Sequence, residues 1–281
     1  EIGVRLVGSE MCIRDSDRAS FCTCRGHRMI EAGAFTIQLA GKRIHIRPLY
    51  DMVREYCKAY IVPDACADLS VQILAEDIAY ERRQSEREAE LAGQKEAAYT
   101  DAYLETLAVY RRIAEWMPMQ NTLLFHGSAI AVDGKAYLFT AKSGVGKSTH
   151  TGLWRAYFGN RAVMLNDDKP LLRMTEDGIY AYGTPWDGKH RFSTNTCAPL
   201  AGICMIRRGS DNMIREITAH EAYPMLLQQC YRPMGKDALI HTLQLLDCFR
   251  EKVPCYELFC NISREAVETA YNGMKGQESD Q

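Results

Sequence analysis

The stretch from Ser143 to Ser148, with the sequence Ser-Gly-Val-Gly-Lys-Ser, constrains the fold more than any other part of the chain. The apolar run at 136–140 before it has the composition of a strand, and residues 149–157 after it favour a helix. Glycine allows backbone conformations in which successive N–H groups point at phosphate oxygens. A strand, a glycine-rich turn and a helix in this order predict a phosphate-binding loop in an α/β protein.

The residue types in this loop indicate ATP and Mg²⁺ as cofactors. Lys147 is expected to reach the β- and γ-phosphates, and the Ser148 hydroxyl to ligate Mg²⁺. The helix that follows would turn the positive end of its dipole toward the same anion. The loop departs from the consensus at its first position, where Ala141 stands in place of glycine. The residues predicted to bind the nucleotide are Ser143, Gly144, Val145, Gly146, Lys147, Ser148 and Thr149.

Two adjacent carboxylates follow the next predicted strand. The short apolar run at 162–165 ends at Asn166, Asp167 and Asp168, and 20 residues separate Lys147 from Asp167. That separation allows one helix and a returning strand, so the acidic pair is expected beside the loop. Mg²⁺ prefers oxygen ligands, and a carboxylate can accept the proton of an attacking hydroxyl. Alone, an Asp-Asp pair is more often a solvated turn, so this prediction depends on the loop.

Composition argues against several classes of partner. The 34 basic and 36 acidic residues give a net charge of −2, which favours neither nucleic acid nor a membrane surface as a partner. No apolar stretch approaches the length that spans a bilayer. The 11 cysteines are an odd number with no Cys-x-x-Cys pair, which predicts free thiols in a reducing cytoplasm.

The chain is expected to divide into four parts. Residues 1–33 show no sustained period and are expected to be an artefact or disordered, with the native start at Met29 or upstream. Cys22, Cys24 and His27 in this part could ligate a metal but lack a fourth partner, so they are set aside. We expect a small α/β region at 34–120, the phosphate-loop domain at 121–275, and a disordered tail at 276–281.

Hydrophobic periodicity predicts the remaining elements. Residues 81–94 are rich in charge without an apolar rhythm, which indicates an exposed helix or a loop. Residues 123–132 are expected to form one strand that turns at Asp133-Gly134 into the strand before the loop. Further strands are predicted at 35–39, 44–46, 71–74, 171–174, 179–182, 201–206 and 256–260, and helices at 101–117, 219–231, 236–250 and 263–274.

The central segment resembles a known family. His126-Gly127, the loop at 143–148 and Asp167-Asp168, at short spacing, are similar to the kinase domain of HPr kinase/phosphorylase, and more distantly to ATP-dependent phosphoenolpyruvate carboxykinase. The runs at 153–155, 166–170 and 183–188 resemble those of bacterial HPr-kinase-related proteins, some of them encoded near peptide-modification genes. The resemblance spans about Phe35 to Met274 and is strongest between residues 124 and 208.

This resemblance implies a carboxykinase-like phosphate-loop fold, with mixed, largely antiparallel sheets and flanking helices. It also implies a Mg-ATP-dependent kinase acting on a hydroxyl, such as a serine of a protein or peptide. One of Asp167 and Asp168 would be the general base and the other a metal ligand beside Ser148, with Asp167 favoured as the base and Asp168 as the ligand, and His126 would approach the phosphates. The loop at 183–191 stands where the family has a glycine-rich signature loop. Its candidate acceptor-binding residues are Asp187, Lys189, His190 and Arg191.

Several alternatives stay open at this stage. His126 follows Phe125 on a strand, where a satisfied core histidine is also expected. His150, in the first helical turn, is predicted to be exposed rather than to contact adenine. Residues 189–191 are equally consistent with a solvated loop. The function could instead be that of a carboxykinase, a non-catalytic ATP-binding module of a peptide-modification system, or an NTPase switch. The related kinases form rings, so a homo-oligomer is possible.

Overall fold

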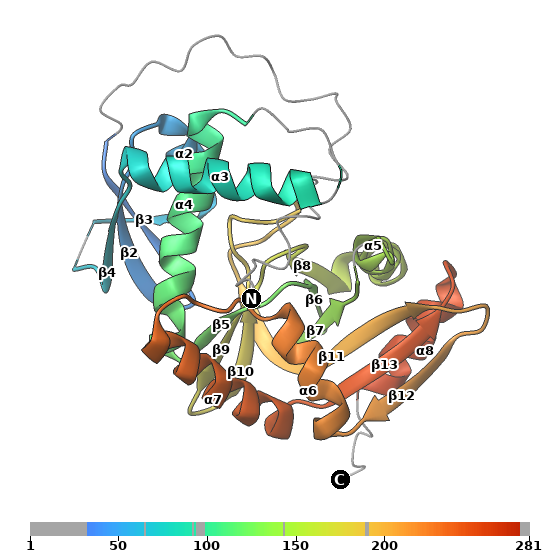
Figure 1. Cartoon of the computed structure of the whole chain (residues 1–281). Helices are drawn as coiled ribbons and strands as arrows, with labels where there is room; N and C mark the ends of the chain where they lie inside the picture. Colours follow the sequence, from blue (N-terminus) through green and yellow to red (C-terminus); the bar gives the residue numbers. More distant parts are fainter. Residues whose placement is uncertain are drawn as a thin grey trace. The chain divides into compact units, whose positions relative to one another are not determined.

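The computed structural model describes residues 33–64, 66–91, 93, 99–142, 144–188 and 191–275. These residues form two compact units, and the division falls between Trp116 and Met117 (Figure 1). The expectations for the N-terminal part, with Cys22, Cys24 and His27, and for the tail at 276–281 lie outside the described residues. So do those for Ser143, Lys189 and His190.

The first unit contains a four-stranded sheet in the order β3-β1-β2-β4. The strands predicted at 35–39 and 44–46 are confirmed, and they form a hairpin in which β1 (Phe35–Leu39) pairs antiparallel with β2 (Lys42–Arg47). Ala40 and Gly41 have φ values of 46° and 72°, as a tight primed turn requires. The sheet is completed by β3 (Ile61–Val62) and β4 (Leu69–Gln72), so the strand expected at 71–74 begins and ends two residues earlier.

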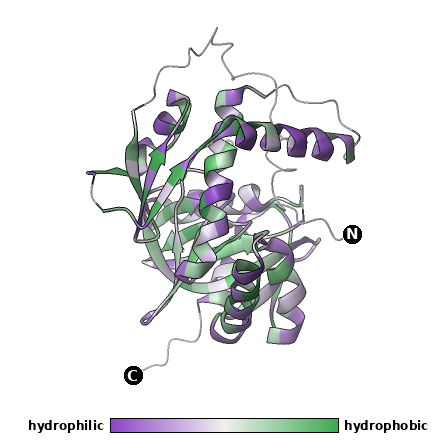
Figure 2. Cartoon of the chain, turned by 60° about the vertical axis from the view of Figure 1, so that its left-hand side comes forward, coloured by the Kyte–Doolittle hydropathy of each residue, from purple (hydrophilic) through white to green (hydrophobic). Residues whose placement is uncertain are grey.

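Three α-helices accompany this sheet: α2 (Asp51–Tyr56), α3 (Ala75–Leu91) and α4 (Asp101–Trp116). The charge-rich stretch forms α3, which is largely hydrophilic (Figure 2). One face of this helix is nevertheless buried. Asp77 and Glu81 are buried against α4, where Arg111 lies 3.1 Å from the Asp77 carboxylate and 2.5 Å from that of Glu81. The charges on this face of α3 pair with α4 rather than with water.

The second unit is built on a mixed sheet with the strand order β5-β9-β10-β11-β7-β6-β8, extended by β13 on β11 and β12 on β13. Most neighbours run antiparallel, whereas β11 pairs in parallel with both β7 and β13. The strands are β5 (Thr122–Leu124), β6 (Ser128–Val132), β7 (Lys135–Thr140), β8 (Ala162–Asn166), β9 (Leu171–Thr175), β10 (Gly178–Tyr182), β11 (Cys197–Arg208), β12 (Met213–Ile217) and β13 (Cys255–Cys260).

The prediction of one strand over 123–132 is wrong. The chain leaves β5 at Phe125 and re-enters the sheet at Ser128, so that β5 pairs with β9 while β6 pairs with β7 and β8. Gly127 makes this crossing possible, since a Cβ atom there would lie 2.9 Å from the Phe139 carbonyl oxygen. The predicted hairpin turn at Asp133-Gly134 between β6 and β7 is confirmed.

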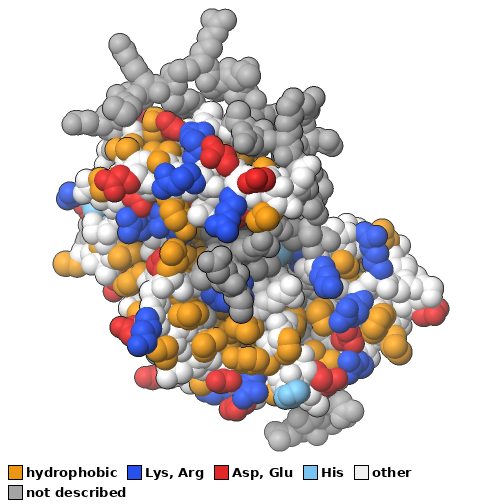
Figure 3. All heavy atoms as spheres, in the orientation of Figure 1, with side chains coloured by type: hydrophobic (Ala, Val, Ile, Leu, Met, Phe, Trp, Pro, Cys, Tyr) orange, Lys and Arg blue, Asp and Glu red, His pale blue; other side chains and the backbone are white. Residues whose placement is uncertain are grey.

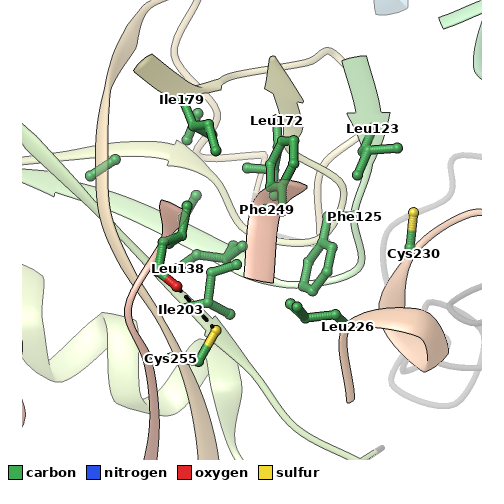
Figure 4. Packing of buried hydrophobic residues seen from close by; sticks show 14 of the residues in the cluster. Leu123, Phe125, Leu138, Leu172, Ile179, Ile203, Leu226, Cys230, Phe249 and Cys255 are labelled. Atoms are coloured by element: carbon green, nitrogen blue, oxygen red, sulfur yellow. Dashed lines mark hydrogen bonds between the residues drawn. The ribbon is translucent and has the colours of Figure 1, made fainter. Parts of the chain in front are cut away.

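Helices cover both faces of the central strands. They are α5 (Lys147–Phe158), α6 (Ala219–Gln229), α7 (Lys236–Lys252) and α8 (Arg264–Met274). On one face, Leu138 and Ile203 pack with Leu226 of α6 and Phe249 of α7 (Figure 4). On the other, Phe139 and the adjacent aromatic side chains of the strands pack against α5 and α8. The alternation along each strand therefore gives two apolar cores, one on each face of the sheet.

The direction of the strands decides where the candidate site lies. β7 and β8 both run antiparallel to β6, so they run in the same direction, and β11 is parallel to β7. The carboxyl ends of these three strands consequently share one edge of the sheet. The segment after β7 leads into α5 through the glycine-rich loop, and the segment after β8 carries the acidic pair.

Candidate functional site

The glycine-rich loop connects β7 to α5, as predicted. Gly144 and Gly146 have φ values of 71° and 120°, in the left-handed region that favours glycine. Helix α5 begins at Lys147, whose side chain is only 5% exposed, whereas Ser148 and Thr149 are exposed. The buried lysine lies at the helix N-terminus, where the helix dipole also favours an anion.

Asn166 shapes the turn that follows β8. Its Oδ1 atom accepts hydrogen bonds from the backbone N–H groups of Asp168 and Lys169 at 2.8 and 2.5 Å. Its Nδ2 atom donates to the carbonyl and hydroxyl oxygens of Thr184 at 3.1 and 2.9 Å. The side chain is fully buried, so all of these bonds are shielded from water. Asn166 thereby fixes both the acidic pair and the start of the 183–191 loop.

Asp167 is 6% exposed and lies against β6. Its Oδ1 atom accepts a 2.7 Å hydrogen bond from the hydroxyl of Ser128, which in turn lies 2.9 Å from the Thr151 hydroxyl of α5. Its Oδ2 atom faces Gly188, where a Cβ atom would lie only 3.1 Å away. The carboxylate thus lies between the strand edge and the 183–191 loop.

Asp168 lies beside two nitrogen-bearing side chains. Its Oδ1 atom is 3.5 Å from His126 Nε2, and its Oδ2 atom is 3.1 Å from Lys169 Nζ. Its backbone carbonyl accepts from the N–H of Gly127 at 2.9 Å, which joins the β8 turn to the segment between β5 and β6. His126, predicted to approach the site, is therefore adjacent to the predicted metal ligand.

The surroundings of His126 favour a neutral imidazole that is unprotonated at Nε2. Its Nδ1 atom donates to Gln229 Oε1 at 2.7 Å, because an amide oxygen can only accept, and this leaves Nε2 unprotonated. Nε2 is buried and has no hydrogen-bond partner among the described residues. Burial, and then the positive charge of Lys147, lower the pKa of His126 to about 4. Two acceptors, Nε2 and Asp168 Oδ1, therefore face each other, an arrangement that a shared cation or proton would stabilise.

The prediction that His150 is exposed is wrong. Its side chain is 3% exposed, its Nε2 atom accepts a 3.0 Å hydrogen bond from Trp154 Nε1, and its ring lies edge-on to Phe139 with centroids 4.7 Å apart. Burial lowers its pKa to about 4. Helical spacing places it on the inner face of α5, opposite the exposed Ser148, so it belongs to the core of this unit.

Within the 183–191 loop, Asp187 and Arg191 differ in burial. Asp187 is 8% exposed and accepts from the Ser193 backbone N–H at 2.9 Å, and burial raises its pKa. This carboxylate therefore stabilises its own loop. Arg191 is exposed, with its N–H bonded to the Gly188 carbonyl at 3.1 Å.

Several residues of the site escaped prediction. Gln229, at the end of α6, is 103 residues from His126, so no local pattern could connect them. The sequence pattern indicates Ser128 only as part of the strand predicted at 123–132. Arg208, at the end of β11, donates to the carbonyl oxygens of Gly144 and Val145 in the phosphate loop. No sequence motif distinguishes this arginine from its neighbour Arg207.

The described residues contain no group of three or more His, Cys, Asp or Glu side chains that could hold a metal ion by themselves. No helix within the described ranges is long and apolar enough to cross a membrane. On the face shown in Figure 3, acidic and basic side chains are interspersed rather than gathered by sign.

Comparisons with known proteins give a limited result. No protein-family model matches the chain, and no curated protein matches it. Among solved structures, an Hpr(Ser) kinase/phosphatase from Coxiella burnetii is similar at 10% identity and a TM-score of 0.33. That match covers 53% of this chain and 87% of the other. At this TM-score the likeness is a weak structural relation that supports no inference about activity.

Proposed function

We propose that this protein is a Mg-ATP-dependent kinase that transfers a phosphoryl group to a hydroxyl, in a serine of a protein or peptide. The observation that carries the proposal is the arrangement at one sheet edge: a buried lysine at a helix N-terminus after a glycine turn, with two buried carboxylates at the end of a neighbouring strand. Phosphoryl transfer relies mainly on positioning and charge neutralisation, which these groups supply.

The residues present fit Mg²⁺ and ATP. Mg²⁺ is usually held by one or two carboxylates together with phosphates and water, which agrees with Asp168 and the exposed hydroxyl of Ser148 as its ligands. The facing lone pairs of His126 Nε2 and Asp168 Oδ1 give a second reason for a cation near this carboxylate. When bound, Mg²⁺ would neutralise charge on the phosphates.

Asp167 is assigned as the general base. The Ser128 hydroxyl donates to its Oδ1 atom and fixes the orientation of the carboxylate, and Oδ2, on the side of Gly188, is proposed to accept the proton of the acceptor hydroxyl. The acceptor oxygen then forms a bond to the γ-phosphorus while the bond to the bridging oxygen of ADP breaks. Lys147 and the N–H groups of the loop stabilise the charge on the transferring group. Arg191, exposed in the adjacent loop, is proposed to bind the acceptor together with Lys189 and His190.

We infer that the protein is cytoplasmic. We also infer that its fold is of the carboxykinase-like phosphate-loop type. In support of this, the mixed sheet has the glycine loop and the acidic pair at the carboxyl ends of strands that run in one direction.

The test is transfer of label from γ-labelled ATP to candidate proteins, peptides and small alcohols. Lys147→Ala should weaken the binding of Mg-ATP by about tenfold or more, because it removes a buried charge-assisted contact to the phosphates. Binding is measured by calorimetry, with Lys142→Ala, an exposed lysine of the same loop, as the control. Unaltered nucleotide affinity in Lys147→Ala would contradict the site itself. ATP consumption without any acceptor would instead indicate an NTPase.

A further inference from the structure

β11 ends beside the phosphate loop. It runs parallel to β7, with Met205 opposite Thr140, the last residue of β7. The strand continues for three more residues to Arg208, while the chain after β7 turns into the loop. The pairing register therefore places the Arg208 side chain level with the glycine turn.

The guanidinium group contacts two successive carbonyl oxygens of that turn. Arg208 Nη2 donates to the Gly144 carbonyl at 2.5 Å, and Nε lies 3.4 Å from the Val145 carbonyl. Arginine presents its N–H groups as a rigid planar fork, so one side chain can hold two neighbouring acceptors. Both acceptors belong to the glycine-rich turn, where Gly144 and Gly146 have φ values of 71° and 120°.

These contacts fix which way the loop's N–H groups point. The Val145 carbonyl and the Gly146 N–H belong to one trans peptide unit and point in opposite directions. An arginine that holds the Val145 carbonyl therefore turns the Gly146 N–H away from itself. The Gly144 carbonyl and the Val145 N–H are related in the same way, and that N–H lies 3.3 Å from the Lys142 carbonyl within the turn.

We infer that Arg208 is a positioning residue of the phosphate loop: it holds the Gly144 and Val145 carbonyls so that the Gly146 N–H is directed toward the nucleotide phosphates before the nucleotide binds. This inference rests on the proposed function. It assigns a role to a residue that lies 64 positions from the loop glycine it contacts.

Arg207 provides a matched control. Its side chain makes an ion pair with Glu257, and Glu257 also accepts from Arg215, 2.8 Å from its Nη2. Removing Arg207 thus takes one arginine from the same strand end while Glu257 keeps a partner and the loop keeps Arg208.

The experiment compares wild type with Arg208→Ala, Arg208→Lys and Arg207→Ala. Amide hydrogen exchange across residues 139–147 is measured without nucleotide, and the dissociation constant of Mg-ATP by calorimetry. In Arg208→Ala we expect faster exchange in this segment, and a dissociation constant raised about five- to tenfold by the loss of one hydrogen-bonding anchor. Arg208→Lys keeps the charge but cannot span both carbonyls, so it should lie between alanine and wild type. Arg207→Ala should match wild type.

Steady-state kinetics separates positioning from a general effect. Because the loop contacts phosphate in both the ground and the transition state, KM for ATP should rise more than kcat falls. Wild-type exchange and affinity in Arg208→Ala, or equal effects from Arg207→Ala, would overturn the inference and leave the proposed function intact. If wild-type protein failed to bind Mg-ATP, the proposed function and this inference would fall together. If Arg208→Ala fails to fold, the same comparison is made with Arg208→Lys.

Discussion

The Ser128 hydroxyl donates a 2.7 Å hydrogen bond to Oδ1 of Asp167, and both side chains are buried. The bond joins β6 to the turn after β8 and fixes the orientation of the carboxylate. An aspartate fixed in this way is suited to accept a proton from a substrate, since its orientation does not have to be established during the reaction.

Asp167→Asn should therefore lower phosphoryl transfer by about 10²-fold or more, because the amide cannot accept the acceptor's proton. Nucleotide binding should persist, and both are measured with labelled ATP and calorimetry. The companion variant Ser128→Ala removes the orienting hydrogen bond, together with the contact to the Thr151 hydroxyl, and should cost about tenfold or less. Unchanged turnover in Asp167→Asn would remove this residue from the mechanism.

Gln229→Leu should change the tautomer of His126. Leucine cannot accept the Nδ1–H, so the proton is expected to move to Nε2, which lies 3.5 Å from Asp168 Oδ1 and can donate to it. The ¹⁵N chemical shifts of the imidazole report the tautomer, and the Mg²⁺ concentration for half-maximal activity should rise. The exposed neighbour Gln228→Leu is the control. A wild-type tautomer in Gln229→Leu would show that Gln229 does not determine it.

Glu105 makes the stability of the first unit depend on pH. Its fully buried carboxylate accepts the N–H groups of Leu49 and Tyr50 at 2.5 and 2.9 Å, and burial raises its pKa from 4.5 to about 7. The folded state then binds more protons than the unfolded state between these values, so stability falls as pH rises from about 4.5 to about 7 and levels off above.

Glu105→Gln should remove that slope, because the amide does not titrate in this range. Chemical denaturation at a series of pH values measures it for both proteins. The variant can lose some stability at all pH values, since one amide oxygen replaces two acceptors. An identical slope in the two proteins would mean that other groups cause the pH dependence.

Gly183→Ala should destabilise the second unit. A Cβ atom at this position would lie 2.1 Å from the Thr194 carbonyl oxygen and 2.6 Å from that of Leu165, both backbone atoms. We expect a loss of about 2 kcal/mol or more in the free energy of unfolding, measured by denaturant titration.

Gly152→Ala is the matched control for that substitution. Gly152 lies within α5, and a Cβ atom there would meet nothing within 4 Å. Alanine has the higher helix propensity, so this change should stabilise the protein by about 0.5–1 kcal/mol. Equal effects of the two substitutions would show that the close contacts at Gly183 relax without cost.

The sequence could predict those parts of the site whose residues are close together along the chain. The loop at 143–148 and the pair Asp167-Asp168 each follow an apolar run, so their positions at strand ends could be read from pattern and spacing. The break at Gly127 could not be predicted in this way, because apolar residues lie on both sides of it and the close approach to the Phe139 carbonyl is visible only in the structure. His150 was predicted wrongly since its burial depends on Trp154 and on strand β7, not on its place beside the loop.

Contacts between residues far apart in the sequence cannot be predicted from local patterns. Gln229 contacts His126 through two acceptors: its backbone carbonyl oxygen accepts the His126 N–H at 2.8 Å, and its side-chain oxygen accepts the Nδ1–H. This alignment follows from the antiparallel bridge between Phe125 and Cys230, which a single sequence does not reveal. The contact of Arg208 likewise depends on the register between β11 and β7.

The length of β11 has a consequence for how the two substrates would influence each other. The strand starts at Cys197, directly after the segment that contains the 183–191 loop, and finishes at Arg208 on the phosphate loop. It is hydrogen-bonded to β10 at its beginning, to β13 at its end and to β7 between. Acceptor and nucleotide would therefore contact segments that one continuous strand connects, and this strand gives their binding energies a physical route to thermodynamic linkage.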